Sequence, residues 1–159
     1  MATSSSSAEP EFSAGGVVLA PGTDATPGPR TEPLRCVVII PTRRAADGSK
    51  VLALPKGHPD PGETALDGAL REVREEAGIV AEMVDELGDV RYFYMREGRR
   101  IAKVVRFYLM RAVAGDLADH DHEVEIARWV TLEEAAATLS YAGEREMVRK
   151  ALSYLHPNK

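Results

Sequence analysis

Three early stretches of the chain, at 12–20, 34–40 and 51–54, are rich in apolar and β-branched residues and are predicted to form strands. The second contains the continuous apolar run Cys36-Val-Val-Ile-Ile. A run without polar alternation is typical of a strand that is covered on both faces. Residues 21–33, between the first two stretches, hold four prolines and two glycines and are expected to form a loop. The pattern therefore predicts a sheet with helices on both sides.

Residues 62–78 carry the clearest helical pattern, because their apolar positions recur on one face at about 100° per residue. Thr64 is placed to cap the start of this helix, and Gly78 is placed to end it. A different arc of the same helix carries three glutamates, called here the acidic ridge: Glu72, Glu75 and Glu76. The helix is thus predicted to be amphipathic, with the acidic ridge away from the core.

The later part of the chain continues the alternation of strands and helices. It predicts strands at 90–96 and 101–112 around a turn at 97–98, a short strand at 125–130, and helices at 131–139 and 143–155. Together with the earlier elements, these segments predict an α/β protein in which a mixed sheet lies between helices. The Ser-rich and Ala-rich residues 1–10 offer little to bury, so we expect a disordered tail followed by a single domain at 11–157.

Size and charge narrow the class of protein. The chain has 159 residues, the size of one ordinary domain. Its formal charge of −5 argues against general binding of nucleic acid. The charge is uneven, because residues 91–111 carry seven basic residues and one acid, a sum of +6 that leaves −11 for the rest. No apolar stretch approaches the roughly 18 residues of a membrane span, and no secretory signal is recognisable, so we expect a cytoplasmic protein without membrane partners.

The acidic ridge needs a physical explanation, because glutamates spaced i, i+3 and i+4 on a helix repel one another. Each like-charge pair costs roughly 0.2–0.5 kcal/mol. A bound cation would remove this repulsion, and carboxylate oxygens at this spacing suit Mg²⁺, for which Mn²⁺ can substitute. For three glutamates alone, a solvated helix face is the alternative interpretation. The neighbouring residues decide between the two.

Those neighbours complete a motif of fixed spacing. It runs from Gly57 over five spacers to Glu63, and over seven more to Arg71-Glu72-Val73-Arg74-Glu75-Glu76-Ala77-Gly78-Ile79. The motif resembles the Nudix box with every specified position filled, and the chain resembles the MutT-like Nudix hydrolases. The resemblance implies the Nudix fold, an α/β/α sandwich. It also implies a divalent-metal-dependent pyrophosphohydrolase, which cleaves a phosphoanhydride bond in a nucleoside diphosphate linked to another group.

The same resemblance implies roles for individual residues of the motif. The implied metal ligands are the backbone carbonyl of Lys56 and the side chains of Glu72, Glu75 and Glu76. Arg71 is implied to orient the neighbouring glutamates, with Glu63 as its partner. The chemistry is consistent, because metal ions that neutralise phosphate oxygens also lower the pKa of the attacking water.

Two parts of the chain could supply the general base, and the sequence does not decide between them. Members of the family take it either from the helix, here Glu72, or from a later acidic loop. Glu123 lies six residues before Trp129, where the diadenosine polyphosphate hydrolases of the family place a functional glutamate. Glu123 is therefore a candidate for both general base and metal ligand. Glu125 is the competing candidate in this loop, and a solvated acidic loop is the alternative for either residue.

The substrate prediction rests on residues outside the helix. The segment LPKGHPDPGET and the strands that follow it resemble bacterial members that cleave diadenosine polyphosphates. Lys56 and His58 are implied to lie at the mouth of the metal site, and Lys103 matches a phosphate-binding lysine of that subgroup. Tyr92 and Tyr94 alternate along a strand and could stack on an adenine, or could equally be core residues. The expected partner is a nucleotide or dinucleoside polyphosphate, bound by a monomer or homodimer.

Other functions remain open at this level. Within enzymes, oxidised or other nucleoside triphosphates and diphosphoinositol polyphosphates are the alternative substrates. A Nudix module that senses a nucleotide without hydrolysing it is the alternative from another class. The intact acidic ridge favours the enzyme, since a pure binding module does not need all three glutamates.

Overall fold

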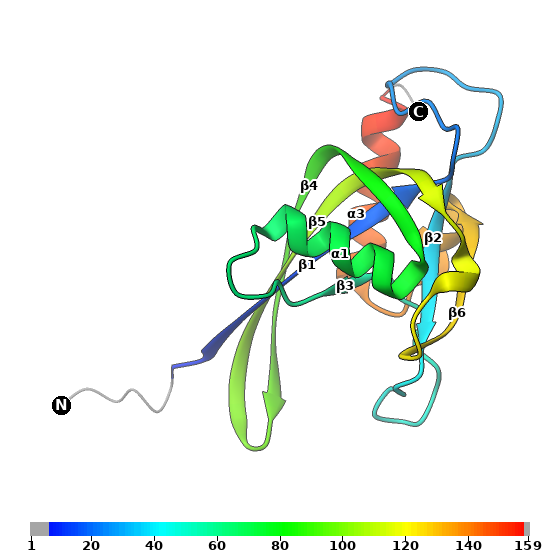
Figure 1. Cartoon of the computed structure of the whole chain (residues 1–159). Helices are drawn as coiled ribbons and strands as arrows, with labels where there is room; N and C mark the ends of the chain where they lie inside the picture. The colour runs from blue at the N-terminus through cyan, green and yellow to red at the C-terminus, as the bar shows by residue number, and fades with distance from the viewer. Residues whose placement is uncertain (1–6, 158–159) are drawn as a thin grey trace.

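A six-stranded mixed sheet forms the centre of the protein in the computed structural model, which describes residues 7–157 (Figure 1). The strands are β1 (Glu9–Leu19), β2 (Arg35–Pro41), β3 (Lys56–Gly57), β4 (Ile79–Arg96), β5 (Arg99–Gly115) and β6 (Val124–Thr131). They are ordered β4-β5-β1-β2-β6, and β3 pairs with β1 beside this path. The β1–β5 pair is parallel and the other pairs are antiparallel.

Helices cover both faces of this sheet. They are α1 (Ala65–Ala77), α2 (Leu132–Thr138) and α3 (Ala142–Leu155), with a short 3₁₀ turn, η2, at Leu117–Asp119. Val37 and Ile39 of β2 pack in the core on the α1 side, whereas Cys36 and Val38 pack in the core beneath α2 and α3. The expected α/β/α sandwich and the doubly covered strand are both confirmed. Among the described residues, no helix is long and apolar enough to span a membrane.

The strands β4 and β5 are longer than the sequence pattern predicts. β4 starts at Ile79, directly after the helix, and not near residue 90. The register shifts at three places along β4, between Val80 and Ala81, between Met83 and Asp85, and between Glu86 and Gly88. Each bulge moves the following side chains to the other face, so the alternation that marks a strand is lost in this segment.

Two other predicted boundaries are wrong. Glu9 and Pro10, assigned to a disordered tail, belong to β1 and pair with Ile101 and Ala102 of β5. The predicted strand at 51–54 is reduced to an isolated bridge between Ala53 and Ile39. In the rest of the predicted tail, Ser7 and Ala8 belong to no helix or strand, and residues 1–6 lie outside the described residues.

The ends of α1 are fixed as the sequence predicts. The Thr64 hydroxyl accepts a hydrogen bond from the Asp67 backbone N–H at 3.0 Å. Gly78 ends the helix with φ 73°, a left-handed conformation that glycine adopts without steric cost. Gly68, in the middle of the helix, lies against the loop before it, because a Cβ there would stand 3.0 Å from the Pro59 Cα. These contacts set the position of α1 relative to the loop at 58–64.

Candidate active site

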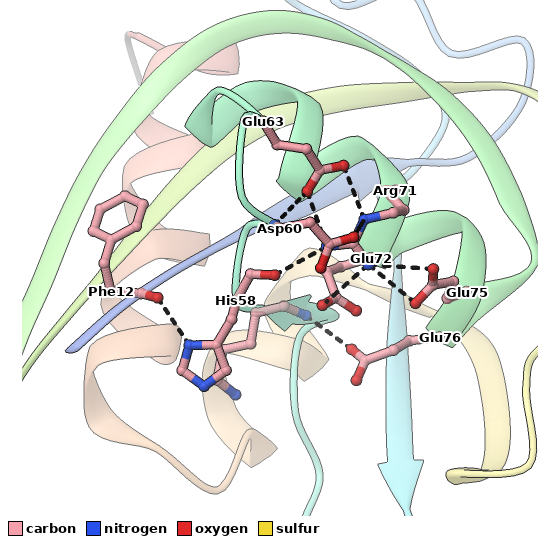
Figure 2. A network of polar contacts seen from close by, with 9 residues as sticks. Phe12, His58, Asp60, Glu63, Arg71, Glu72, Glu75 and Glu76 are labelled. Atoms are coloured by element: carbon pink, nitrogen blue, oxygen red, sulfur yellow. Dashed lines mark hydrogen bonds and ion pairs between the residues drawn. The ribbon is translucent and has the colours of Figure 1, made fainter.

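Arg71 is the centre of a polar network between α1 and the preceding loop (Figure 2). Its guanidinium donates to Glu63 Oε2 at 2.9 Å, to the His58 carbonyl oxygen at 2.9 Å and to both Glu75 carboxylate oxygens at 3.2 Å. Glu72 Oε2 lies 3.6 Å from the same group. The hydrogen bonds that Arg71 donates to Glu63 are the largest cause that raises the pKa of Arg71. The predicted contacts of Arg71 with Glu63 and with the ridge are thus present.

Arg71→Lys is expected to destabilise the protein although it keeps the charge. An ammonium cannot reproduce the planar guanidinium fork that reaches three partners at once. We expect the free energy of unfolding to fall by about 1–3 kcal/mol, the scale of lost hydrogen bonds to charged groups. Urea unfolding of the two proteins measures this difference. Equal midpoints would mean that Arg71 does not hold the loop to the helix.

Glu72 and Glu76 of the acidic ridge are much less exposed than Glu75. Glu76 Oε1 accepts a hydrogen bond from the Lys56 backbone N–H at 2.9 Å. Burial raises the pKa of Glu72 to about 7 and that of Glu76 to about 8. Gly57 faces Glu72 so closely that a Cβ at this position would overlap the Glu72 carboxylate. The Glu72 carboxylate therefore lies against backbone that only a glycine allows to approach, and Glu76 lies against the backbone of the preceding Lys56.

This donor set fits a hard divalent cation. Within residues 7–157 no three acidic, His or Cys side chains already form a closed cage for a metal. Mg²⁺ does not require one, because it is commonly held by one or two carboxylates together with waters and substrate phosphates. Glu72 and Glu76 offer two such carboxylates in an environment where their negative charge is poorly compensated. A divalent cation would supply the missing positive charge.

Lys56 contacts the acidic ridge through its backbone N–H and helix α3 through its ammonium. Its ammonium lies 2.9 Å from Glu144 Oε2 of α3, and the other Glu144 oxygen accepts the Leu54 backbone N–H at 2.8 Å. Burial works against the charged ammonium, but Glu144 raises the pKa of Lys56. Sequence reasoning missed Glu144, because an acid in the first turn of a helix is ordinarily an end-capping residue. Lys56 thus reaches the site with its charge already paired.

Lys103 and Tyr94 are likewise engaged, around Glu11 of β1. Glu11 Oε1 accepts from Lys103 Nζ at 2.9 Å and from the Tyr94 hydroxyl at 2.5 Å, and Arg96 contacts the other oxygen at 2.5 Å. Partial burial opposes ionisation of Glu11, yet these hydrogen bonds lower its pKa to about 2. Burial lowers the pKa of Lys103. Two of the seven basic residues at 91–111, Lys103 and Arg96, are therefore paired with the same acid on β1, which the local charge count could not reveal.

A cavity of about 950 Å³ opens beside these groups. Six of the residues predicted to form the site line it: Lys56, His58, Glu76, Tyr92, Tyr94 and Lys103. The Tyr92 and Tyr94 ring centroids are 6.1 Å apart. Because Tyr92 is 44% exposed, it is not a core residue, whereas Phe107 is buried at the cavity wall. Arg71, Glu72, Glu75 and Glu123 do not belong to the lining.

The acidic loop before β6 lies against the end of α1. The Asp121 backbone N–H donates to the Glu75 carbonyl oxygen at 2.8 Å, and the charge of Asp121 contributes to the raised pKa values of Glu72 and Glu76. Glu123 is exposed, and its backbone carbonyl accepts the Thr42 N–H at 2.8 Å. Asp121 was overlooked in the sequence, although it lies two residues from Glu123 in the same loop.

Glu123 and Glu125, the two candidates for the general base in this loop, differ in whether their carboxylates form ion pairs. Glu125, the competing candidate for the general base, pairs with Arg44 at 2.6 Å and with Lys50 at 3.4 Å. Within residues 7–157 no ion pair involves the Glu123 carboxylate. Glu123 consequently keeps its carboxylate available, and Glu125 does not.

Three features together define a Nudix domain: helix α1 with its acidic ridge, the loop between Gly57 and Gly62, and the mixed sheet. The family model described as NUDIX domain matches residues 30–151, and the chain belongs to this family. It is 40% identical over 141 residues to the putative mutator protein MutT4 of Mycobacterium tuberculosis, covering 89% of this chain and 54% of that protein. The chain thus spans about half the length of this relative.

A bis(5'-nucleosyl)-tetraphosphatase and a solved Ap4A hydrolase are similar to this chain over most of their own length. The asymmetrical bis(5'-nucleosyl)-tetraphosphatase of Caenorhabditis elegans is 33% identical, over 64% of this chain and 73% of that protein. Among solved structures, a C. elegans Ap4A hydrolase binary complex matches with a TM-score of 0.67 at 24% identity, covering 91% of this chain and 96% of that one. At this identity the structural match shows the fold, and it confirms the predicted Nudix fold.

Proposed function

We propose that the protein is a divalent-metal-dependent pyrophosphohydrolase that cleaves a phosphoanhydride bond in a nucleoside diphosphate linked to another group. The observation that carries the proposal is the pair Glu72 and Glu76. Both carboxylates are largely buried and poorly compensated, and Glu76 lines the 950 Å³ cavity. Such an arrangement costs stability unless a cation compensates the two carboxylates.

The residues of the site have different roles in this reaction. Glu72 and Glu76, supported by Glu75 and by the Lys56 carbonyl, hold Mg²⁺ or Mn²⁺, which supplies charge neutralisation and an acidified water. Arg71 fixes Glu75 and the loop at 58–63 by the contacts described above. Glu72 or Glu123 accepts the proton of the attacking water.

A diadenosine polyphosphate is the substrate that we propose. Tyr92 and Tyr94 offer rings at the cavity, and a stacked base is worth about 1–3 kcal/mol. Lys56, His58 and Lys103 place nitrogen groups along the same wall for phosphate oxygens. The names of the C. elegans relative and of the mouse bis(5'-nucleosyl)-tetraphosphatase, 30% identical over 118 residues, support this substrate class.

Two alternatives keep specific support. The MutT4 relative has a higher identity to this chain than the C. elegans and mouse tetraphosphatases, and its name as a mutator protein favours oxidised or other nucleoside triphosphates. The Nudix domain of Shewanella oneidensis NrtR was solved with ADP-ribose, and it matches this fold with a TM-score of 0.69 at 14% identity. A Nudix module that binds a nucleotide without turnover is the second alternative. Diphosphoinositol polyphosphates remain a further candidate substrate.

A substrate panel with Mg²⁺ tests the proposal. Diadenosine tetra- and hexaphosphate, ADP-ribose, nucleoside triphosphates, 8-oxo-dGTP and a diphosphoinositol polyphosphate are incubated separately, and the products are identified by anion-exchange chromatography and mass spectrometry. We expect the dinucleoside polyphosphates to give the highest kcat/KM. Preferential cleavage of 8-oxo-dGTP would favour the mutator-type alternative, and tight binding of nucleotides without products would favour the sensing module.

A further inference from the structure

The cations around the cavity differ in whether an acid already neutralises them. Lys56 is paired with Glu144 at 2.9 Å, and Lys103 and Arg96 share Glu11. A paired cation gives up part of its attraction for a phosphate, because its partner must be displaced or repels the ligand. Lys56 and Lys103, which the sequence proposes for phosphate binding, are therefore already paired with acids before a ligand binds.

Arg43 lines the same cavity without an acidic partner. It lies just after β2, is exposed, and donates from Nη2 to the Tyr141 hydroxyl oxygen over a long 3.4 Å. Within residues 7–157 no ion pair involves Arg43. Burial of part of the group opposes its charge, while Tyr141, Glu76 and Glu144 raise the pKa of Arg43. The guanidinium is thus charged, lines the same cavity as the ridge carboxylate Glu76, and is held by a long hydrogen bond to Tyr141.

We propose that Arg43 is a specificity-determining residue that binds the phosphates of a polyphosphate chain beyond the anhydride held at the acidic ridge. A guanidinium binds two phosphate oxygens at once in a planar fork, which an ammonium cannot do. Breaking the long bond to Tyr141 costs little, so the group can turn to a ligand. This inference rests on the proposed hydrolase function and names the residue that would select long phosphate chains.

The neighbouring residue provides a matched control. Arg44 carries the same charge one position later, but it is bound to Glu125 at 2.6 Å and to the Thr42 carbonyl at 3.2 Å. It does not line the cavity. Arg43→Ala and Arg44→Ala therefore remove the same charge from the same exposed loop, and only the first removes it from the cavity.

The experiment compares kcat/KM for diadenosine hexaphosphate and ADP-ribose in the wild type and both variants, with Mg²⁺. Arg43→Ala is expected to lower kcat/KM for the hexaphosphate by about 10- to 100-fold and for ADP-ribose by less than about 3-fold, because only the longer chain extends past the ridge. Arg44→Ala should change neither value by more than about 2-fold. Arg43→Lys should recover only part of the loss, since it restores charge but not the fork.

Binding of inorganic tripolyphosphate, measured by calorimetry without added metal, makes the inference independent of turnover. Its dissociation constant should rise by about 10-fold or more in Arg43→Ala and stay unchanged in Arg44→Ala. If the wild type hydrolyses nothing in the panel but this difference is found, the hydrolase function fails and phosphate binding by Arg43 stands. Equal effects of the two variants, or equal losses for both substrates in an active enzyme, would overturn the inference.

Discussion

Excess EDTA is expected to lower turnover by at least about 10³-fold, and added Mg²⁺ or Mn²⁺ should restore it. A polyphosphate chain repels an incoming hydroxide, and a metal ion both reduces this repulsion and acidifies the water. The two lysines at the cavity, Lys56 and Lys103, do not replace these effects, because both are already paired with acids. Initial rates on diadenosine tetraphosphate before and after chelation measure the change. Undiminished activity in excess chelator would contradict the assignment of a metal-dependent reaction.

The acidic ridge should also make stability depend on pH and metal together. The pKa of Glu72 is raised to about 7 and that of Glu76 to about 8, so in the metal-free folded protein both carboxyls stay protonated at a pH where the unfolded chain has ionised them. Stability due to the protonated forms is therefore lost as the pH rises through these values. A bound divalent cation removes the cost of ionisation. We expect Mg²⁺ to raise the melting temperature more at about pH 8 than at about pH 6.

The features that could be predicted from the sequence are those that depend on residues close together in the chain. The amphipathic pattern of α1, its cap at Thr64 and its end at Gly78 lie within 17 residues of Gly62 and are reproduced in the structure. The contact of Arg71 with Glu63, eight positions away, was implied by the resemblance of the motif and is present in the structure. The same resemblance predicted that Arg71 contacts the acidic ridge, and the structure shows its contacts with Glu75 and Glu72.

Contacts between distant strands could not be predicted in this way. Lys103 and Glu11 are separated by 92 positions and meet because β1 and β5 pair in parallel. Glu144 reaches Leu54 across 90 positions because α3 packs on the sheet against β4 and β1. A sum of charge over residues 91–111 therefore does not show which of its cations are already paired with acids. The same limit applies to Arg43 and Arg44, which are equivalent in sequence and differ only in what the fold brings near them.

Glu76→Gln is expected to change activity and stability in opposite directions. Glutamine keeps the volume and an oxygen that can accept the Lys56 backbone N–H, but it removes an anionic ligand. We expect kcat to fall by at least about 10²-fold, the scale of losing one electrostatic contact made in the transition state. In the metal-free protein at about pH 9, where Glu76 must be ionised, the free energy of unfolding should instead rise by about 1–4 kcal/mol.

Glu146→Gln is the control, because Glu146 is exposed on α3 and makes only a 3.4 Å ion pair with Arg149. Loss of such a pair changes stability by about 0–1 kcal/mol and should leave kcat unaltered. Urea unfolding with EDTA at about pH 6 and pH 9 separates the electrostatic gain from any packing change, since the gain should shrink at the lower pH. A Glu76→Gln protein that is less stable at both pH values would show that the carboxylate stabilises the fold. Near-normal kcat in the same variant would exclude Glu76 as a metal ligand, and the buried charge at the cavity would then need another function.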